Sequence, residues 1–488
     1  MVFSSLLFLY VFLPLNLAFY ALAKDIRTKN TVMLIFSLVF YAWGEPVYVL
    51  LLVGMALADW FLSHFIGKNR GTGKAKLGLV LACAIDLGLL AVFKYTGFLL
   101  GNAQALFGVP KFIPEIALPI GISFYTFQLL SYVVDVYSGE VVPQKKFRTL
   151  LLYVSLFHQC IAGPIVRYSD VERELTCRHA SWRDMSDGLT RFTVGLAKKA
   201  LLANTCGVLA DSFLVKDSAG LTGEALGQAN TLLSSRPALA LWLGMLAYML
   251  QIYLDFSAYS DMAIGMGRMI GFHYKENFDY PYCSKSVGEF WRRWHISLGS
   301  FFRDYVYIPL GGNRRGKGRM FFNMFIVWAL TGLWHGASWN FVLWGLYFFV
   351  FLVLERTVLQ KFLVCAPAFL SRFYLLAVVY FGWILFRFRD IGQVGMVLSG
   401  MFTGRGGFTS FETNVLLGGY AVFFVTAVIA VTPVAKLVRR AVARLEEGGA
   451  AAAAAGTGLR VLFPVALLLL STAALVGDSY NPFLYFQF

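Results

Sequence analysis

The chain has 488 residues, of which 58% are hydrophobic and only 14% are charged. A soluble domain carries about 25% charged residues, so this chain lacks the polar surface that would keep it in water. Its formal net charge of +15 could suggest a nucleic-acid partner. The cations lie in loops between apolar runs, however, where they fit the positive-inside rule and contact with anionic lipid headgroups. Composition therefore indicates a multi-span membrane protein that contacts membrane lipids and no nucleic acid.

Apolar runs long enough to cross a bilayer recur along the chain. One crossing needs about 20 residues, and the runs amount to roughly eleven to thirteen transmembrane or re-entrant segments, counting short or broken ones. The first five cover residues 2–23, 31–43, 47–66, 77–100 and 117–137. Basic loops that contain Lys24, Lys74 and Lys145 follow alternate segments. The positive-inside rule then predicts that Met1 lies outside and that these loops lie inside.

The middle of the chain is less regular. The segment over residues 150–166 ends in Gly163–Pro164, which predicts a re-entrant or broken segment that faces a cavity. Apolar stretches over residues 192–213 and 238–270 follow, and then a basic, aromatic block over residues 273–319. Residues 321–354 carry no formal charge, and this length of roughly 34 residues is too long for one crossing and short for two. Gly332 and Gly336 flank its centre and predict a bent or broken helix there.

The C-terminal part combines a basic loop, a low-complexity stretch and one more span. Basic residues near Lys436 mark another inner loop, and residues 445–458 are predicted to form a flexible Ala/Gly linker. The last span covers residues 461–476, which would leave residues 478–488 as an extracytoplasmic C-terminal tail. No long-period internal repeat is found. We therefore expect a single all-α transmembrane domain over residues 1–488.

His335 is the sharpest candidate for chemistry, because polar groups within apolar segments are costly and are functional candidates by default. It lies in the middle of the overlong apolar segment. A buried imidazole is kept neutral and can accept a proton. Acyl transfer to a hydroxyl needs such a base beside the nucleophile, in a site that excludes water. A structural histidine that is hydrogen-bonded between helices is the alternative, and the residues alone favour neither.

A second candidate region alternates tryptophans with cations over residues 291–295. Arg292 and Arg293 could pair with a phosphate-bearing donor near His295. An interfacial belt with snorkelling arginines is the simpler explanation of these residues taken alone. Asp255 and Asp261 lie in an otherwise apolar stretch, where ion pairing or helix capping is favoured over catalysis. The six cysteines show no Cys-x-x-Cys pair and predict neither a metal site nor a disulfide framework.

Five motifs then occur in one order along the chain: residues 118–128 (LPIGISFYTFQ), 161–165 (IAGPI), the Asp255/Asp261 block, 291–295 (WRRWH) and 334–336 (WHG). Together they resemble the membrane-bound O-acyltransferases (MBOAT), specifically the bacterial AlgI/DltB-like branch of alginate O-acetyltransferases and D-alanyl transferases. The resemblance covers nearly the whole chain. Five spaced motifs in order are far more specific than any one alone. His158 departs from the pattern, which has a proline at that position.

The resemblance implies a ring of helices around a thin central region with a central tunnel. It also implies that His335 is the essential histidine of the family and that His295 is its second conserved histidine. The tail over residues 483–488 resembles a motif in which a tyrosine, here Tyr485, is proposed to carry the acyl group at the outer face. An aromatic anchor at the interface is the alternative for Tyr485. The residues expected to bind substrate are Gln128, Asp255, Arg292, Arg293 and Trp334.

The function implied by the resemblance is acetyl transfer at the bacterial inner membrane by a multi-pass enzyme. Acetyl-CoA would be the donor substrate, with no permanently bound cofactor and no metal. The acceptor would be a secreted or cell-surface polysaccharide, with an alginate-like exopolysaccharide favoured over peptidoglycan or other glycans. An extracytoplasmic partner, an acetyltransferase similar to SGNH hydrolases, would complete the transfer. The alternatives are a D-alanyl or other acyl transferase fed by a carrier protein, a membrane transporter, and a non-catalytic membrane anchor.

Overall fold

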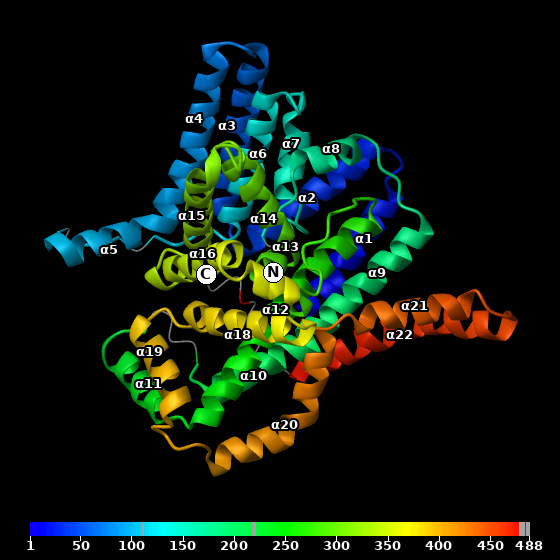
Figure 1. Cartoon of the computed structure of the whole chain (residues 1–488). Coiled ribbons are helices and arrows are strands. Elements are labelled where there is room, and N and C mark those ends of the chain that lie inside the picture. Colours follow the sequence, from blue (N-terminus) through cyan, green and yellow to red (C-terminus); the bar gives the residue numbers. More distant parts are fainter. Residues whose placement is uncertain (110–111, 115, 162, 217–220, 478–483, 485–488) are drawn as a thin grey trace. The chain divides into compact units, whose positions relative to one another are not determined.

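The computed structural model describes residues 1–488 except 110–111, 115, 162, 217–220, 478–483 and 485–488 (Figure 1). Within these described residues the regular elements are all helices, which confirms the all-α class. Seven helical segments are long and apolar enough to cross a membrane: 48–68, 73–107, 238–269, 339–357, 368–387, 411–430 and 450–477. Two shorter apolar segments cover 8–22 and 391–403. The larger number expected from sequence included segments that are shorter or less apolar than these seven, such as α2 (Ile26–Gly44) and α15 (Gly316–His335).

The described chain forms two compact units that alternate along the sequence. The first unit contains residues 1–192, 259–277 and 297–309, and the second contains residues 193–258, 278–296 and 310–488. The long helix α12 (Ala238–Met269) begins in the second unit and ends in the first. The chain that was expected to form a single domain is therefore divided into two units, and each unit is built from three separate segments of the sequence.

The first unit consists mainly of helices from the N-terminal part of the chain. Its elements are the π-helical turns η1 (Phe8–Phe12), η2 (Ala91–Tyr95) and η5 (Arg303–Tyr307), and helices α1 (Leu13–Leu22), α2 (Ile26–Gly44), α3 (Tyr48–Lys68), α4 (Gly73–Leu90), α5 (Thr96–Phe107), α6 (Ile122–Ser138), α7 (Phe147–Ser155), α8 (Tyr168–Thr176) and most of α9 (Trp182–Ala197). Helices α3 and α4 pack side by side, and both pack on α6 (Figure 1).

The predicted break near Gly163–Pro164 is present in the first unit. Helix α7 ends at Ser155, and residues 156–161 and 163–167 form bends and turns without a helix. Gly163 has a φ of +104°, which glycine adopts without strain. His158, where a proline was expected, is buried and its Nδ1 is 3.0 Å from the hydroxyl of Tyr274. The imidazole of His158 thus has a specific polar partner, Tyr274, although the backbone around His158 is irregular.

The second unit contains the remaining elements. They are η3 (Lys198–Ala203), a π-helical turn, η4 (Pro281–Cys283), a 3-10 turn, and helices α10 (Asn204–Phe213), α11 (Gly223–Ser235), most of α12, α13 (Val287–Arg293), α15 (Gly316–His335), α16 (Trp339–Thr357), α17 (Gln360–Cys365), α18 (Ala368–Arg387), α19 (Ile391–Thr403), α20 (Phe411–Ala430), α21 (Val434–Glu446) and α22 (Ala450–Gly477). Helix α14 (Ile296–Phe302) follows α13 directly and carries the chain back to the first unit.

Helices α15 and α16 form the hairpin that the overlong apolar segment predicted, with the break at residues 336–338. Two glycines let their backbones approach closely. A Cβ atom on Gly332 would lie 2.3 Å from the carbonyl oxygen of Phe341, and one on Gly345 would lie 2.3 Å from that of Trp328. Both distances are too short for any side chain, so the geometry of this hairpin depends on glycine at these two positions.

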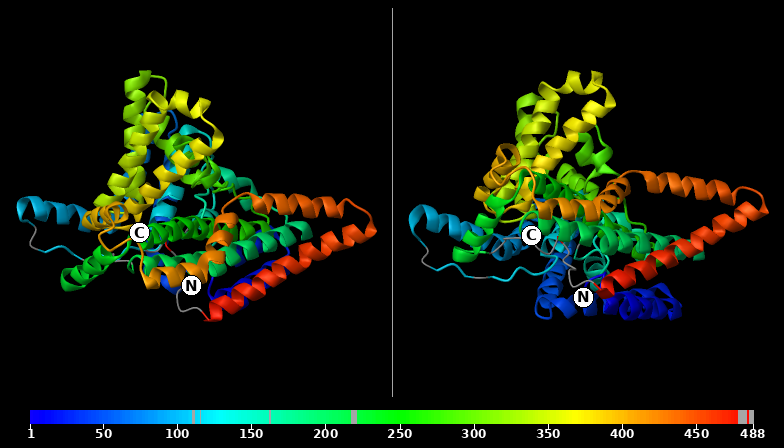
Figure 2. Two further views of the ribbon diagram at one scale, coloured as in Figure 1. Left: turned by 60° about the horizontal axis from the view of Figure 1, so that its bottom comes forward. Right: turned by 90° about the horizontal axis from the view of Figure 1, so that it is seen from below.

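Helices α21 and α22 also pack against each other as an antiparallel pair (Figure 2). The alanine run that was expected to belong to a flexible linker over residues 445–458 instead forms the first turns of α22. Alanine has the highest intrinsic helix propensity, which explains this difference. The connection between the two helices is therefore only residues 447–449.

Candidate active site

The last turn of α15 positions His335 in the second unit. The helix ends there because the next residue, Gly336, has an extended backbone with φ −173° and ψ 152°. A Cβ atom on Gly336 would lie 2.3 Å from the ring of Phe341, so a larger residue at this position would displace that buried ring. The break that was visible in the sequence thus places the histidine at a helix end.

His335 is enclosed by aromatic side chains and is only 4% exposed. Its ring centroid lies 5.0 Å from Trp334, 5.0 Å from Trp344 and 5.2 Å from Phe386, each at a steep interplanar angle. These rings come from α15, α16 and α18. Such an enclosure excludes bulk water, as an acyl-transfer site requires.

His295 lies in the two-residue connection between α13 and α14. Helix α13 begins at a cap in which Ser286 Oγ accepts a hydrogen bond of 3.0 Å from the N–H of Glu289. It ends at Arg293, and His295 then adopts a φ of +47°. A non-glycine residue in this left-handed region carries a conformational cost of about 1–3 kcal/mol. Residues held in this way are concentrated at functional sites.

The two histidines share one aromatic neighbour. The ring of Trp334 lies 5.6 Å from that of His295 and 5.0 Å from that of His335, centroid to centroid. Trp334 is 2% exposed and His295 is 3% exposed, so all three side chains are buried. Three residues that the sequence analysis selected separately therefore belong to one cluster, which we call the histidine–tryptophan cluster (His295, Trp334 and His335).

Burial also sets the charge of His295, which lies outside the seven candidate membrane helices. Desolvation lowers the pKa of His295 from 6.5 to about 3. The imidazole is therefore neutral at physiological pH, when it can accept or relay a proton.

Arg292 and Arg293 are near the cluster in sequence but already face carboxylates. Arg293 Nη2 lies 2.7 Å from Glu289 Oε1, one helical turn earlier. Glu355 accepts hydrogen bonds from the backbone N–H groups of Val287 and Gly288 at the start of α13, 2.5 and 2.9 Å long, and the charge of Arg292 acts on it. Arg292 is exposed and Arg293 is half-buried. Of the two, Arg292 has the more accessible guanidinium group.

Asp255 lies in the buried interior of the second unit and is ion-paired. Its Oδ1 is 2.7 Å from Nζ of Lys199, and its Oδ2 accepts a hydrogen bond of 2.9 Å from the backbone N–H of Leu484. Lys199, Asp255 and Leu484 are all 3% exposed or less. The ion pairing anticipated for Asp255 is thus present, and a residue of the C-terminal tail takes part in it.

The other residues that the sequence analysis singled out do not belong to the histidine–tryptophan cluster. Gln128 is buried in α6 of the first unit. Asp261, also in the first unit, is ion-paired with Arg191 at 2.9 Å. Tyr485 lies outside the described residues. The described part of the chain gathers no group of three or more His, Cys, Asp or Glu side chains that could hold a metal ion.

The sequence analysis did not select Lys199, although a signal for it was present. Lys199 lies within an apolar stretch of residues 192–213, and a charged side chain in such a stretch needs a partner. Phe386 and Trp344 were also not selected. Aromatic residues are too common in apolar helices for their sequence positions to reveal which of them surround a histidine.

Comparison with known proteins identifies the family of the chain. The sequence model of the MBOAT family, the membrane-bound O-acyltransferases, matches residues 146–392, which contain both histidines. The chain is 37% identical to the probable alginate O-acetylase of Pseudomonas putida over the whole of both proteins. It is 31% identical to the peptidoglycan O-acetyltransferase of Helicobacter pylori over 82% of this chain and 80% of that protein. It is 26% identical to the teichoic acid D-alanyltransferase of Bacillus subtilis over 47% of this chain and 56% of that one.

The chain belongs to the membrane-bound O-acyltransferase family. It is an O-acyltransferase that uses an acyl donor and is a multi-pass protein of the bacterial inner membrane. The transporter and the non-catalytic anchor considered above are therefore excluded as its class.

Proposed function

We propose that the protein passes acetyl groups from cytosolic acetyl-CoA across the inner membrane toward a secreted or cell-surface polysaccharide. The observation that carries this proposal is the histidine–tryptophan cluster, in which two buried imidazoles contact one buried indole ring. An alginate-like exopolysaccharide is the favoured acceptor, because whole-length relatives are probable alginate O-acetylases.

In the proposed reaction, His335 acts as the general base. Its imidazole accepts the proton of an acceptor hydroxyl while the hydroxyl oxygen attacks the thioester carbonyl carbon. The new C–O ester bond forms, the C–S bond breaks, and the leaving thiolate takes up the proton from the imidazolium. The aromatic enclosure keeps water from competing as the nucleophile. His295 and Trp334 are proposed to hold the reacting groups beside His335.

The remaining selected residues are given roles in substrate handling. Arg292, exposed at the end of α13, is proposed to contact the phosphates of the donor, with Arg293 beside it. Gln128 is retained as a proposed substrate contact on the motif over residues 118–128 alone. Asp255 is proposed to act indirectly, because its contacts are to Lys199 and to the tail.

Tyr485 is proposed to receive the acetyl group and present it to the acceptor or to an extracytoplasmic partner similar to SGNH hydrolases. A phenol, with a pKa near 10, leaves an ester more readily than a sugar hydroxyl does. The hydrogen bond from Leu484 to Asp255 supports this role, since it fixes the residue immediately before Tyr485 within the second unit.

The test is polymer acetylation in a strain that lacks the gene, complemented with wild type, His335→Ala or His158→Ala. Mass spectrometry of the purified polymer should find acetate with wild type and with His158→Ala, and a loss of at least about 100-fold with His335→Ala. His158 is a matched control, because it is an equally buried histidine of the first unit. Near-normal acetylation in a stably inserted His335→Ala protein would refute the role of His335.

The second candidate function is D-alanyl transfer fed by a carrier protein, which the similarity to the teichoic acid D-alanyltransferase favours. That similarity covers only 47% of this chain, whereas the acetyl-transferring relatives match most or all of it. The same mass spectra separate the two functions, since D-alanyl esters and acetyl esters add different masses to the polymer. Finding D-alanine in place of acetate would establish the second function.

A further inference from the structure

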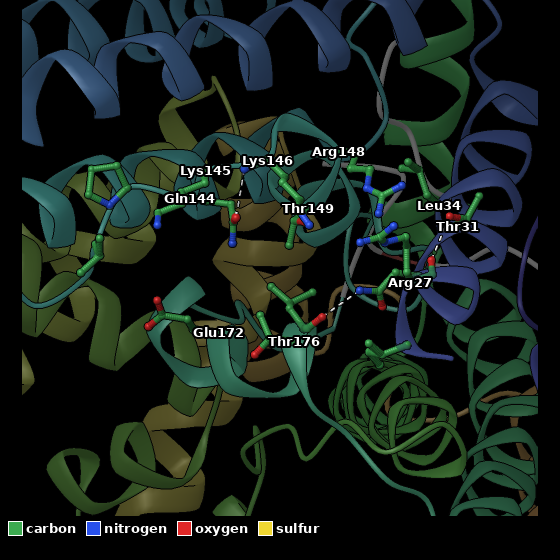
Figure 3. Close-up of a pocket in the computed structure, with 15 residues that line it drawn as sticks. Arg27, Thr31, Leu34, Gln144, Lys145, Lys146, Arg148, Thr149, Glu172 and Thr176 are labelled. Atoms are coloured by element: carbon green, nitrogen blue, oxygen red, sulfur yellow. Dashed lines mark hydrogen bonds between the residues drawn. The ribbon is translucent and has the colours of Figure 1, made fainter. Parts of the chain in front are cut away.

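A cavity of about 440 Å³ lies in the first unit, and its lining contains none of the residues selected above for catalysis or substrate binding. It is formed by the beginning of α2, the connection from α6 to α7, the beginning of α7, and α8 (Figure 3). Four cationic side chains line it: Arg27, Lys145, Lys146 and Arg148. Glu172 is the single carboxylate in its lining.

The four cations are not neutralised by the protein. All four are exposed, and none of them forms an ion pair with a carboxylate in the described part of the chain. Glu172 lies at the opposite end of the cavity from Arg27 and Arg148 (Figure 3). Partial burial raises the pKa of Glu172. The lining of the cavity therefore carries an excess of positive charge.

Two of the four cations, Arg27 and Arg148, are arranged so that both could bind one phosphate group. The guanidinium groups of Arg27 and Arg148 reach toward each other from α2 and α7 (Figure 3). Two like charges in this arrangement repel each other unless an anion lies between them. A planar guanidinium group matches the oxygen geometry of phosphate with two parallel hydrogen bonds, so a pair of arginines fits a phosphate better than a pair of lysines would.

The cavity wall also holds the backbone around these arginines in place. Asn30 Nδ2 donates a hydrogen bond of 2.7 Å to the carbonyl oxygen of Leu175, which joins α2 to α8. Gln144 Nε2 donates one of 2.7 Å to the hydroxyl of Tyr168, which joins the α6–α7 connection to α8. The elements that carry Arg27 and Arg148 are therefore both fastened to one helix, and the spacing of the two arginines is set by the fold.

We propose that this cavity binds a phosphate group between Arg27 and Arg148, with Lys145 and Lys146 at its rim. The phosphate would belong either to an anionic lipid headgroup or to a soluble phosphorylated compound. A general excess of basic residues in inner loops explains the presence of these cations but not their convergence on one cavity from two separate loops.

The test compares two double variants of the full-length protein purified in a neutral detergent. Arg27→Gln/Arg148→Gln removes the proposed site. Lys74→Gln/Lys76→Gln removes the same number of charges from the first turn of α4, and neither of these residues lines the cavity. The probes are coenzyme A, measured by calorimetry, and phosphatidylglycerol against phosphatidylcholine, measured as lipid retained in native mass spectrometry. Elution as a single species confirms that each variant is folded.

The proposal expects Arg27→Gln/Arg148→Gln to weaken binding of at least one phosphate probe by about tenfold or more, while Lys74→Gln/Lys76→Gln binds as wild type does. Loss of phosphatidylglycerol retention identifies a lipid site, and loss of coenzyme A binding identifies a site for a soluble phosphorylated compound. Unchanged binding of both probes in Arg27→Gln/Arg148→Gln, or an equal loss in both double variants, overturns the proposal. These measurements require no acyl transfer, so their outcome is independent of the function proposed above.

Discussion

The backbone N–H of Leu484 donates a hydrogen bond of 2.9 Å to Asp255, although the two residues are 229 positions apart in the sequence. Asp255 is held from its other side by Lys199, which lies in the π-helical turn η3. The last helix, α22, packs against the same turn. Leu484 is therefore held inside the second unit by the carboxylate of a buried ion pair.

The first prediction is that loss of the Asp255 carboxylate releases the tail. Leu484→Cys in the full-length protein should react slowly with maleimide, and addition of Asp255→Asn should accelerate the reaction about ten- to a hundredfold. A hydrogen bond to a charged group contributes about 1.5–3 kcal/mol, which corresponds to this range. Peptide mass spectrometry follows the labelling, with the exposed Cys177 as a fast internal reference and the buried Cys206 as a protected one.

Asp261→Asn is the matched control, because it removes a carboxylate from the same helix but from a different ion pair. It should leave the labelling of Leu484→Cys unchanged. Since Asp255→Asn removes the carboxylate that pairs with the buried Lys199, Lys199→Met/Asp255→Leu provides a variant in which both charges of this pair are absent. This double variant should also release the tail, and slow labelling in it would contradict the anchoring role.

The second prediction concerns Tyr485. Tyr485→Phe should abolish polymer acetylation but spare acetyl-CoA binding, because the relay needs the hydroxyl and the donor site does not. An aromatic anchor predicts that the same variant is silent, since the ring remains. Polymer-bound acetate and donor affinity are to be measured on one preparation. Normal acetylation would leave Tyr485 with the anchoring role alone.

The third prediction is that His295 does not titrate between pH 5 and 8. Burial lowers its pKa to about 3, so the ratio of the transfer rates of wild type and His295→Gln should stay constant over that range. The unfolded chain binds a proton at this histidine below about pH 6.5, whereas the folded protein does not. Wild type should therefore lose stability relative to His295→Gln as the pH falls below 6.5, by up to about 1.4 kcal/mol per pH unit.

Thermal unfolding of both proteins between pH 4 and 8 measures this difference. A rate ratio that changes with a midpoint near pH 6.5 would show that the imidazole is charged at neutral pH. That result would contradict the proposal that His295 is neutral in the active site.

The fourth prediction concerns the close approach of α15 and α16. A Cβ atom at position 345 would lie 2.3 Å from the carbonyl oxygen of Trp328. Gly345→Ala should therefore force the hairpin apart, destabilise the protein by about 1–3 kcal/mol, and reduce transfer by displacing His335. Gly418→Ala in α20 meets no atom within 4 Å and should be neutral or stabilising by up to about 1 kcal/mol. Equal thermal stability of the two variants would contradict this account of the hairpin.

Much of the fold follows from local patterns. Helix α12 covers residues 238–269, where an apolar stretch over residues 238–270 was predicted. The break between α15 and α16 falls at the glycine-flanked centre of the overlong apolar segment. In both cases the length of an apolar run and the position of glycine decide the structure, and both can be read directly from the sequence.

The candidate site was only partly predictable, for a different physical reason. His335, His295 and Trp334 were selected individually, but their gathering around one indole ring depends on the packing of α13, α14 and α15. The partnership of Lys199 and Asp255 joins residues 56 positions apart through the π-helical turn η3. Neither relationship leaves a periodic signal in the chain, so a pattern of single residues cannot reveal it.

The alternation of the two units along the chain also governs the order in which the protein can be completed during synthesis. The first unit needs residues 297–309, so its last piece leaves the ribosome only after more than half of the 488 residues have been made. Arg191 emerges 70 residues before Asp261 and 85 residues before Glu276, its two carboxylate partners. An N-terminal fragment that ends before residue 309 therefore contains neither unit in full. We expect truncated products of this gene to be recognised and degraded as unfinished membrane proteins rather than to persist as stable fragments.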